Sequence, residues 1–218
     1  MNNVDTIIFD MDGTLLKSDT YCIDAIQKAI SDVFKKHKIN AKVPSQKIIL
    51  REVGKPSRQF YSDILPENHK NLIAEVFSEI QKNESDALRN GKGKLFDGTI
   101  QTLKYLKEKN YNLALVSNCS SHYFHTVIDV FNLDKYLSKT VCIGDGENFT
   151  KGKIVAKFIK EFDSKSAVMV GDRFYDIEAG KQNGCKTIGC LYGYGDKLEL
   201  KNADFLIKDI SNLKEIFR

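Results

Sequence analysis

One short stretch near the start constrains the fold of this chain more than any other. Residues 6–9 are apolar and mostly β-branched, and two carboxylates spaced one residue apart, Asp10 and Asp12, follow them directly. Such a run predicts a buried strand, and Gly13 predicts a sharp turn at its end. Open α/β sheets bind their ligands at the carboxyl ends of strands. The two acids are therefore expected in a binding site, although an ordinary Asp-Gly turn would also explain the pattern.

The closeness of the two carboxylates indicates what this site binds. Two acids at one strand end repel each other unless a cation or a proton lies between them. A divalent metal removes that repulsion and creates a site for a phosphate dianion. The stretch therefore predicts a metal-assisted phosphate site.

The pattern of apolar residues divides the chain into two parts. Between residues 17 and 91 the apolar residues recur at helical spacing and no strand is predicted, which indicates a small all-helical insertion. From residue 92 on, strands predicted at 113–116, 141–143, 167–170, 187–191 and 205–207 alternate with helices near 100–110, 123–131, 154–162 and 177–182.

This alternation predicts an α/β fold with a doubly wound parallel sheet. The sheet domain comprises residues 1–16 and 92–218, and the helical domain comprises residues 17–91. Two connections, near residues 15–19 and 90–97, are expected to form a double hinge between them.

Composition excludes several classes of function. The chain has 218 residues and a net charge of +4, with lysines and acids interspersed, so nucleic-acid binding is not expected. It contains no apolar run of about 18 residues and no signal segment, so neither a membrane span nor secretion is expected. Five cysteines without Cys-x-x-Cys spacing favour a reducing, cytoplasmic location and no zinc site. Whether the protein is a monomer or a dimer stays open.

Further candidate residues follow the later strands. Ser117 and Asn118 end the strand at 113–116, and Gly171-Asp172 ends the strand at 167–170. Asp176 lies one helical turn after Asp172, so both carboxylates can face one site. Lys151 begins a helix, where the helix dipole disfavours a cation, and it is therefore expected to have an anionic partner. Lys153 is the competing candidate for that role.

Taken together, these motifs resemble those of the haloacid dehalogenase-like hydrolases. Asp-x-Asp-Gly-Thr at 10–14 resembles the nucleophile motif, and Ser117, Lys151 and Gly171-Asp172 with Asp176 resemble the three later motifs in the required order. The resemblance covers essentially the whole chain. Residues 191–195 and 203–207 further resemble the tail of phosphoglycolate-phosphatase-like members, which carry a helical cap after the first strand.

The resemblance implies a role for each residue. Asp10 would be the nucleophile that forms an aspartyl phosphate, and Asp12 would be the general acid/base. Mg²⁺ would be held by Asp10, Asp172 and the backbone carbonyl of Asp12. Asp176 would either support these ligands without contacting the metal or bind the metal through a water molecule. The phosphate-binding residues would be Thr14, Ser117, Asn118 and Lys151.

An acid at position 12 favours a phosphatase or a phosphomutase over a dehalogenase. The expected activity is hydrolysis of a small phosphorylated metabolite, such as phosphoglycolate or a sugar phosphate. A β-phosphoglucomutase-like mutase, a nucleotidase, a pyrophosphatase and a non-catalytic binding protein are the alternatives. Cys119, next to the second motif, is expected to have no catalytic role.

The helical insertion contains one further candidate. Residues 51–56 are predicted to form a turn between two helices, marked by Gly54 and Pro56. This turn resembles the specificity loop that related caps lower onto the active site. Arg51 and Lys55 are expected there to meet an anionic end of the leaving group.

Overall fold

The structure is a computed structural model and describes residues 3–218. These residues form one six-stranded sheet in the order β3-β2-β1-β4-β5-β6, and all neighbouring strands are parallel. The strands are β1 (Thr6–Phe9), β2 (Asn112–Ser117), β3 (Lys139–Cys142), β4 (Ala167–Gly171), β5 (Lys186–Cys190) and β6 (Phe205–Ile207). The prediction of a parallel, doubly wound sheet is confirmed. The strand order reverses between β1 and β4, which is where sheets of this kind bind ligands.

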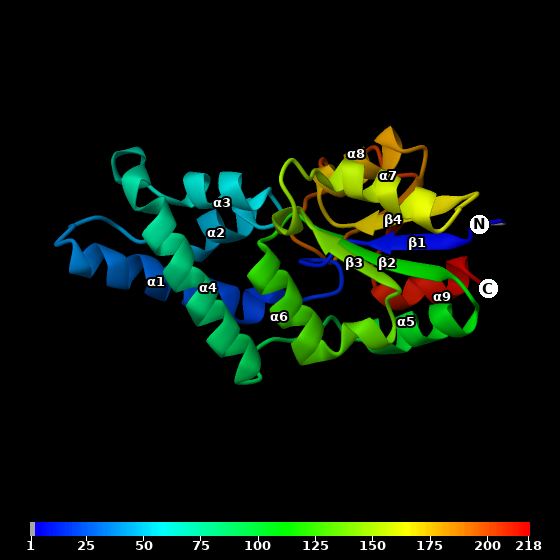
Figure 1. Ribbon diagram of the computed structural model, residues 1–218, viewed down its shortest axis with the longest axis horizontal. Helices are drawn as coiled ribbons and strands as arrows, with labels where there is room; N and C mark the ends of the chain where they lie inside the picture. The colour runs from blue at the N-terminus through cyan, green and yellow to red at the C-terminus, as the bar shows by residue number, and fades with distance from the viewer. Residues whose placement is uncertain (1–2) are drawn as a thin grey trace.

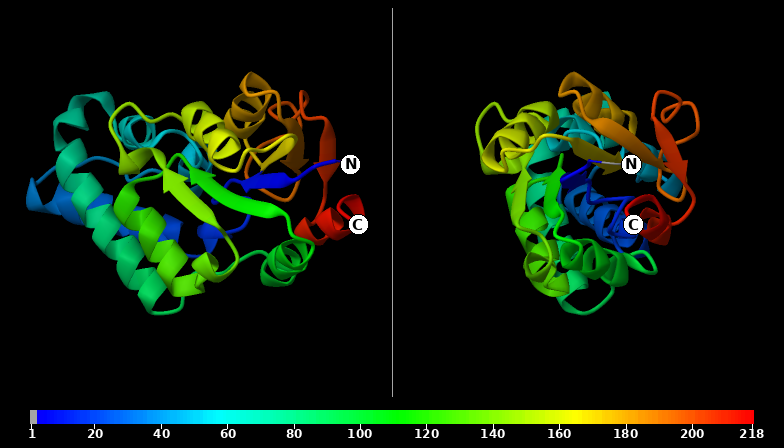
Figure 2. Two further views of the ribbon diagram at one scale, coloured as in Figure 1. Left: turned by 45° about the vertical axis from the view of Figure 1, so that its right-hand side comes forward. Right: turned by 90° about the vertical axis from the view of Figure 1, so that its right-hand side faces the viewer.

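Helices cover both faces of the sheet (Figures 1 and 2). One face is covered by α5 (Thr99–Glu108), α6 (Ser121–Phe131) and α9 (Leu213–Ile216), and the other by α7 (Lys151–Glu161) and α8 (Phe174–Gln182). Side chains of β1 alternate between two hydrophobic clusters, one on each face of the sheet. Ile7 and Phe9 lie in the larger cluster and Ile8 in the smaller. We call the sheet together with the helices on its two faces the core. Burial on both faces explains why the strand reads as a continuous apolar run.

Four helices form a separate group beyond the carboxyl ends of the strands (Figure 1). They are α1 (Cys22–Lys36), α2 (Gln46–Glu52), α3 (Ser57–Ile64) and α4 (Ile73–Arg89), and we call residues 17–91 the helical region. Helices α1 and α4 are amphipathic and bury Ile26, Ile30, Val76 and Ile80. Both chain termini lie at the opposite end of the molecule (Figure 1).

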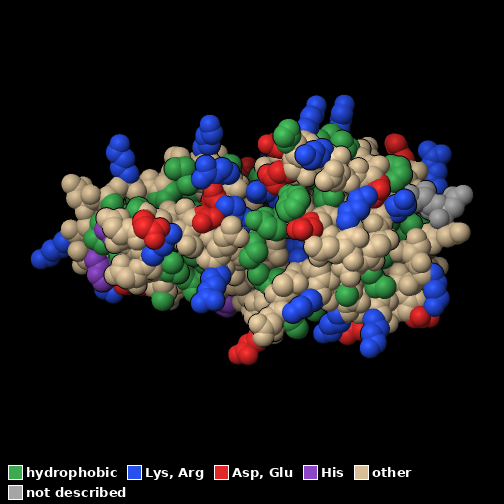
Figure 3. Space-filling view, turned by 90° about the horizontal axis from the view of Figure 1, so that it is seen from above, with side chains coloured by type: hydrophobic (Ala, Val, Ile, Leu, Met, Phe, Trp, Pro, Cys, Tyr) green, Lys and Arg blue, Asp and Glu red, His purple; other side chains and the backbone are tan. Residues whose placement is uncertain are grey.

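Short 3₁₀ turns connect several of these elements, at Ser18–Thr20, Glu67–Leu72, Leu133–Lys135, Ile143–Asp145 and Ile210–Asn212. Among residues 3–218, no helix combines the length and the apolar character that crossing a membrane requires. On the face shown in Figure 3, Lys and Arg side chains are scattered over the core and the helical region, with Asp and Glu among them. The charge of this face is therefore mixed.

Several element boundaries differ from those predicted by one to three residues. The strand expected at 141–143 is β3, which begins at Lys139, and Ile143 lies in a 3₁₀ turn. The helix expected near 177 begins at Phe174. The predicted turn at 51–56 is wrong at its start, since Arg51 lies in the last turn of α2. The apolar anchor Ile49 is fully buried and accepts a hydrogen bond from the Val53 N–H at 3.1 Å, which extends the helical winding past residue 51.

Candidate active site

The end of β1 lies at the strand-order reversal and carries the first acidic residue. The backbone N–H of Asp10 donates to the carbonyl oxygen of Val170 at 2.9 Å, so the ladder between β1 and β4 continues into the site. Gly13 follows with a φ of +81°, and a Cβ there would lie 2.2 Å from Oδ2 of Asp172. Position 13 therefore requires glycine both for its backbone conformation and for the approach of the two motifs.

Three carboxylates converge at this point. One oxygen from each of Asp10, Asp172 and Asp176 lies within 4.8 Å of the others, and all three residues are buried. Burial and the charge of Asp176 raise the pKa of Asp10, and the same two causes raise the pKa of Asp172 to about 7. Within residues 3–218, Oδ2 of Asp10 is buried without a hydrogen-bond partner. A divalent cation would compensate this excess of negative charge, and oxygen donors are the ligands that Mg²⁺ prefers.

Lys151 is the cation of the site. Its ammonium group lies 2.6 Å from Oδ1 of Asp10 and 2.6 Å from Oδ1 of Asp176. Burial alone would lower the pKa of Lys151, but the charges of these two acids raise it above the ordinary value, so the side chain stays charged. Lys153 is exposed, and its ammonium donates to the carbonyl oxygen of Asn148 at 3.1 Å. The structure thus brings Lys151, and not Lys153, to Asp10.

Asp12 belongs to a separate hydrogen-bonded chain. The Tyr123 hydroxyl on α6 donates to Oδ1 of Asp12 at 2.7 Å and is itself hydrogen-bonded to the Tyr21 hydroxyl. All three residues are buried, and burial raises the pKa of Asp12. A carboxyl group with a raised pKa holds a proton more readily and is suited to act as an acid as well as a base.

The residues predicted to bind phosphate are not all directed at one point. Ser117 lines the same cavity as Asp10 and Asp12, and its hydroxyl accepts the Cys119 N–H at 3.2 Å. Asn118 also lines the cavity, but its side-chain amide donates to the carbonyl oxygen of Gly54 at 2.9 Å and so contacts the helical region. The Thr14 hydroxyl lies 3.5 Å from Oδ1 of Asp172, and Thr14 is outside the cavity lining.

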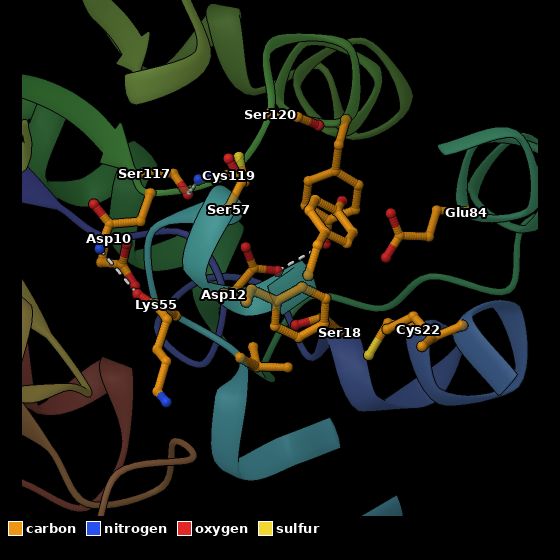
Figure 4. A pocket seen from close by; sticks show the side chains of 17 residues that line it. Asp10, Asp12, Ser18, Cys22, Lys55, Ser57, Glu84, Ser117, Cys119 and Ser120 are labelled. Atoms are coloured by element: carbon orange, nitrogen blue, oxygen red, sulfur yellow. Dashed lines mark hydrogen bonds between the residues drawn. The ribbon is translucent and has the colours of Figure 1, made fainter. Parts of the chain in front are cut away.

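The cavity lies between the core and the helical region and has a volume of about 60 Å³ (Figure 4). Lys55 lines it, but its ammonium is paired with Glu52 and, at 2.6 Å, with Asp63. In Figure 4 this ammonium points away from Asp10. Arg51 is outside the cavity lining, and its guanidinium is paired with Glu52 at 2.6 Å. That these two cations read the leaving group stays a prediction.

Sequence reasoning missed three contributors. Arg173 donates hydrogen bonds to the backbone carbonyls of Arg51 and Val53 and so ties the core to the helical region. Tyr123 holds Asp12, and the sequence carries no signal for it beyond its helical setting. Glu84 lines the cavity from α4.

Glu84 did have a signal in the sequence. It falls in the i, i+4 series of buried apolar residues formed by Val76, Ile80 and Leu88. An acid within an apolar helical stripe is unusual enough to suggest that it faces a site.

Comparison with known proteins leads to the same family that the sequence motifs resemble. The family model described as haloacid dehalogenase-like hydrolase matches residues 7–190. The chain belongs to this family, and both the resemblance and the prediction of a hydrolase are confirmed.

Curated relatives align over nearly the full length of both chains. Pyrophosphatase PpaX of Anoxybacillus flavithermus is 28% identical, over 98% of this chain and 97% of the relative. Phosphoglycolate phosphatase of Aquifex aeolicus is 29% identical, over 96% and 95%. The crystal structure of a predicted phosphoglycolate phosphatase from Haemophilus somnus matches with a TM-score of 0.86 and 22% identity, over 100% of both chains, and this shows the shared fold.

Proposed function

We propose that the protein is a magnesium-dependent phosphatase that hydrolyses a small phosphomonoester through an aspartyl phosphate on Asp10. One observation carries the proposal. The free Oδ2 of Asp10, the hydrogen-bonded carboxyl group of Asp12 and the buried ammonium of Lys151 meet where β1 and β4 end. A nucleophile, an acid/base and a charge-stabilising cation are the parts that two-step phosphoryl transfer requires. The relatives named phosphatase and pyrophosphatase support the same reaction class.

In the first step, a carboxylate oxygen of Asp10 attacks phosphorus in line. The bond between phosphorus and the leaving-group oxygen breaks, and that oxygen takes a proton from Asp12. Lys151, together with the Ser117 hydroxyl that lines the cavity, stabilises charge on the equatorial oxygens. The products of this step are an alcohol and an aspartyl phosphate.

In the second step, Asp12 removes a proton from a water molecule. The water oxygen attacks phosphorus, the bond to the Asp10 carboxylate breaks, and phosphate leaves. Asp10 is regenerated as a carboxylate and Asp12 is protonated again, so atoms and protons balance over the cycle. Asp10, Asp172 and the Asp12 carbonyl would hold Mg²⁺, which would screen the repulsion between the nucleophile and the phosphate dianion.

The helical region acts in this proposal as a cap over the site. Two hydrogen bonds connect residues 53–57 to the core. The Asn118 side-chain amide donates to the Gly54 carbonyl, and the Ser57 N–H donates to the Asn118 carbonyl, both at 2.9 Å. The cavity between the core and the helical region is small, about 60 Å³. This size supports a small substrate.

An assay of phosphate release tests the proposal. Purified protein is incubated with p-nitrophenyl phosphate and with acetyl phosphate, with Mg²⁺ and with excess chelator. We expect hydrolysis of at least one ester that depends on Mg²⁺ and is lost in Asp10→Asn. Absence of hydrolysis for every ester with Mg²⁺ present would favour the alternative of a non-catalytic binding protein.

The place in the cell is a further part of the proposal. All five cysteines are free thiols, which supports a reducing compartment and hence a cytoplasmic location.

A further inference from the structure

Glu84 is a buried acid whose charge nothing in the described chain compensates. It lies on α4 and is 7% exposed, and its carboxyl group makes no hydrogen bond or ion pair with any of residues 3–218. Burial, and then the charge of Asp12, raise the pKa of Glu84 well above its ordinary value. A buried carboxyl group without a partner is costly, which suggests that its partner is a ligand.

The position of Glu84 in the cavity shows which part of a ligand it would meet. In Figure 4, Asp10 lies at one end of the cavity and Glu84 at the other, with Asp12 between them and the Glu84 carboxyl group directed toward the middle. Phosphorus is bound at the Asp10 end in the proposed reaction. Glu84 therefore faces the far end of the leaving group.

The surroundings of Glu84 are aromatic. Phe60, Tyr61 and Tyr123 line the same cavity, and Glu84 contributes after burial to the raised pKa of Tyr61. Aromatic faces next to a carboxylate attract a cation both through the ring quadrupole and through charge. This combination suits an ammonium group.

A leaving group with a second negative charge is poorly matched to this wall. Lys55 and Arg51 are the nearby cations of the helical region, and both already have acidic partners. Lys151 is paired at the Asp10 end. A carboxylate or a second phosphate would thus face Glu84, and no residue that lines the cavity offers it an unpaired Lys or Arg side chain.

We propose that the leaving group carries a primary ammonium group that binds between Glu84 and the aromatic rings, so that the substrate is the phosphomonoester of a small amino alcohol. This rests on the proposed phosphatase function and narrows it. The small cavity, of about 60 Å³, favours a leaving group of a few non-hydrogen atoms. Glu84 would be a residue that determines specificity, and it takes no part in the transfer of the phosphoryl group.

Three esters of nearly equal size and different charge test the proposal with the intact enzyme. They are O-phosphoethanolamine with an ammonium end, 2-hydroxyethyl phosphate with a neutral end, and phosphoglycolate with a carboxylate end. We expect kcat/KM for O-phosphoethanolamine to exceed that for 2-hydroxyethyl phosphate by about tenfold or more, the usual range for a hydrogen bond between charged groups. Phosphoglycolate is expected to be the poorest of the three.

Two variants connect the preference to Glu84. Glu84→Gln keeps the shape and removes the charge, so it should make the ammonium and neutral esters nearly equal, chiefly through a loss of kcat/KM for O-phosphoethanolamine. Glu79→Gln is the matched control, because Glu79 lies on the same helix and outside the cavity lining. It should retain the full preference.

A wild-type enzyme that prefers phosphoglycolate, or that treats the three esters alike, would overturn the proposal. So would a preference that survives in Glu84→Gln. Hydrolysis of p-nitrophenyl phosphate without preference for the ammonium ester refutes this inference alone, whereas hydrolysis of no ester at all refutes the proposed phosphatase function as well.

Discussion

The two walls of the cavity differ in how their polar groups are satisfied. On the core wall, Asp10 has one unpartnered oxygen, and the backbone fixes the two acids behind it, since the Tyr194 N–H donates to Asp172 at 2.6 Å and the Arg173 N–H donates to Asp176 at 2.8 Å. On the helical wall, Glu84 has no partner within residues 3–218 and lies among aromatic rings. In the proposed function, the core wall is preorganised for the charge of a phosphoryl group, and Glu84 on the helical wall is left to bind the leaving group. Catalysis and specificity would then be divided between two parts of one chain.

The largest effect is expected at the core wall, from Asp10→Asn. The amide is nearly isosteric but cannot act as the nucleophile, so activity should fall below about 1% of wild type, at least about 2.7 kcal/mol in the barrier. Steady-state rates and thermal unfolding of both proteins measure this. A folded Asp10→Asn variant with more activity than that would contradict the nucleophile assignment.

Loss of the metal site is expected to lower activity nearly as much as Asp10→Asn does. Asp172→Ala removes one of the three converging carboxylates and should lower the rate by orders of magnitude, with a raised Mg²⁺ requirement measured by titration. Excess chelator should abolish activity, and Ca²⁺ should inhibit, because its looser coordination misplaces the attacking carboxylate. Full activity in excess chelator would contradict a role of the metal ion in the reaction.

Two lysines of helix α7 allow a matched comparison between a buried and an exposed cation. Lys151→Met removes the ammonium that lies 2.6 Å from Asp10 and should lower kcat by at least about hundredfold. Lys153→Met, two residues away and exposed, is the matched control and should be close to wild type. Similar losses in both variants, measured on one ester, would show that Lys151 has no special role.

A smaller effect is expected from Tyr123→Phe. Loss of the 2.7 Å hydrogen bond to Asp12 should lower kcat by about tenfold with little change in KM. The loss should be larger for an alkyl ester than for p-nitrophenyl phosphate, whose leaving group needs less help from an acid. Tyr136→Phe serves as the control, since no hydrogen bond of the Tyr136 hydroxyl is found in residues 3–218. Equal losses on both esters would argue against a role through Asp12.

The smallest effect is expected from Cys119→Ala. Burial raises the pKa of the Cys119 thiol well above its ordinary value, so the thiolate that a nucleophile requires is disfavoured. Activity should stay within about threefold of wild type. A loss of several orders of magnitude in a variant with an unchanged melting temperature would show that this residue takes part in the chemistry.

The core wall could be predicted from sequence because its residues follow strand ends. A buried strand makes an apolar run, and the acids and hydroxyls that follow it, such as Asp10 and Ser117, fall at the same edge of a parallel sheet. The helical wall could not be predicted in the same way. Its cavity residues lie on helix faces, and which face meets the core depends on how the helical region packs.

Arg51 and Lys55 illustrate this limit. Their charge and the turn at Gly54 indicated a loop that reads anions, but the pairing of both cations with Glu52 depends on the short helix α2 and its packing. Glu84 is not singled out in the same sequence, because the residues next to it, Asn83 and Ser85, are polar and only its spacing from Ile80 and Leu88 marks it. A charged side chain in the sequence is therefore a weaker indication of a binding site than a buried charged side chain that the structure leaves without a partner.

The most direct test of the central claim is to trap the phosphorylated enzyme. Enzyme in excess is mixed with a radiolabelled phosphate ester and Mg²⁺, quenched in acid within milliseconds, reduced with borohydride and mapped by peptide sequencing. Because an acyl phosphate is reduced to an alcohol, the account predicts homoserine at position 10 and a base-labile label that Asp10→Asn lacks. Turnover without a labelled intermediate, or a label on any residue other than Asp10, would contradict it.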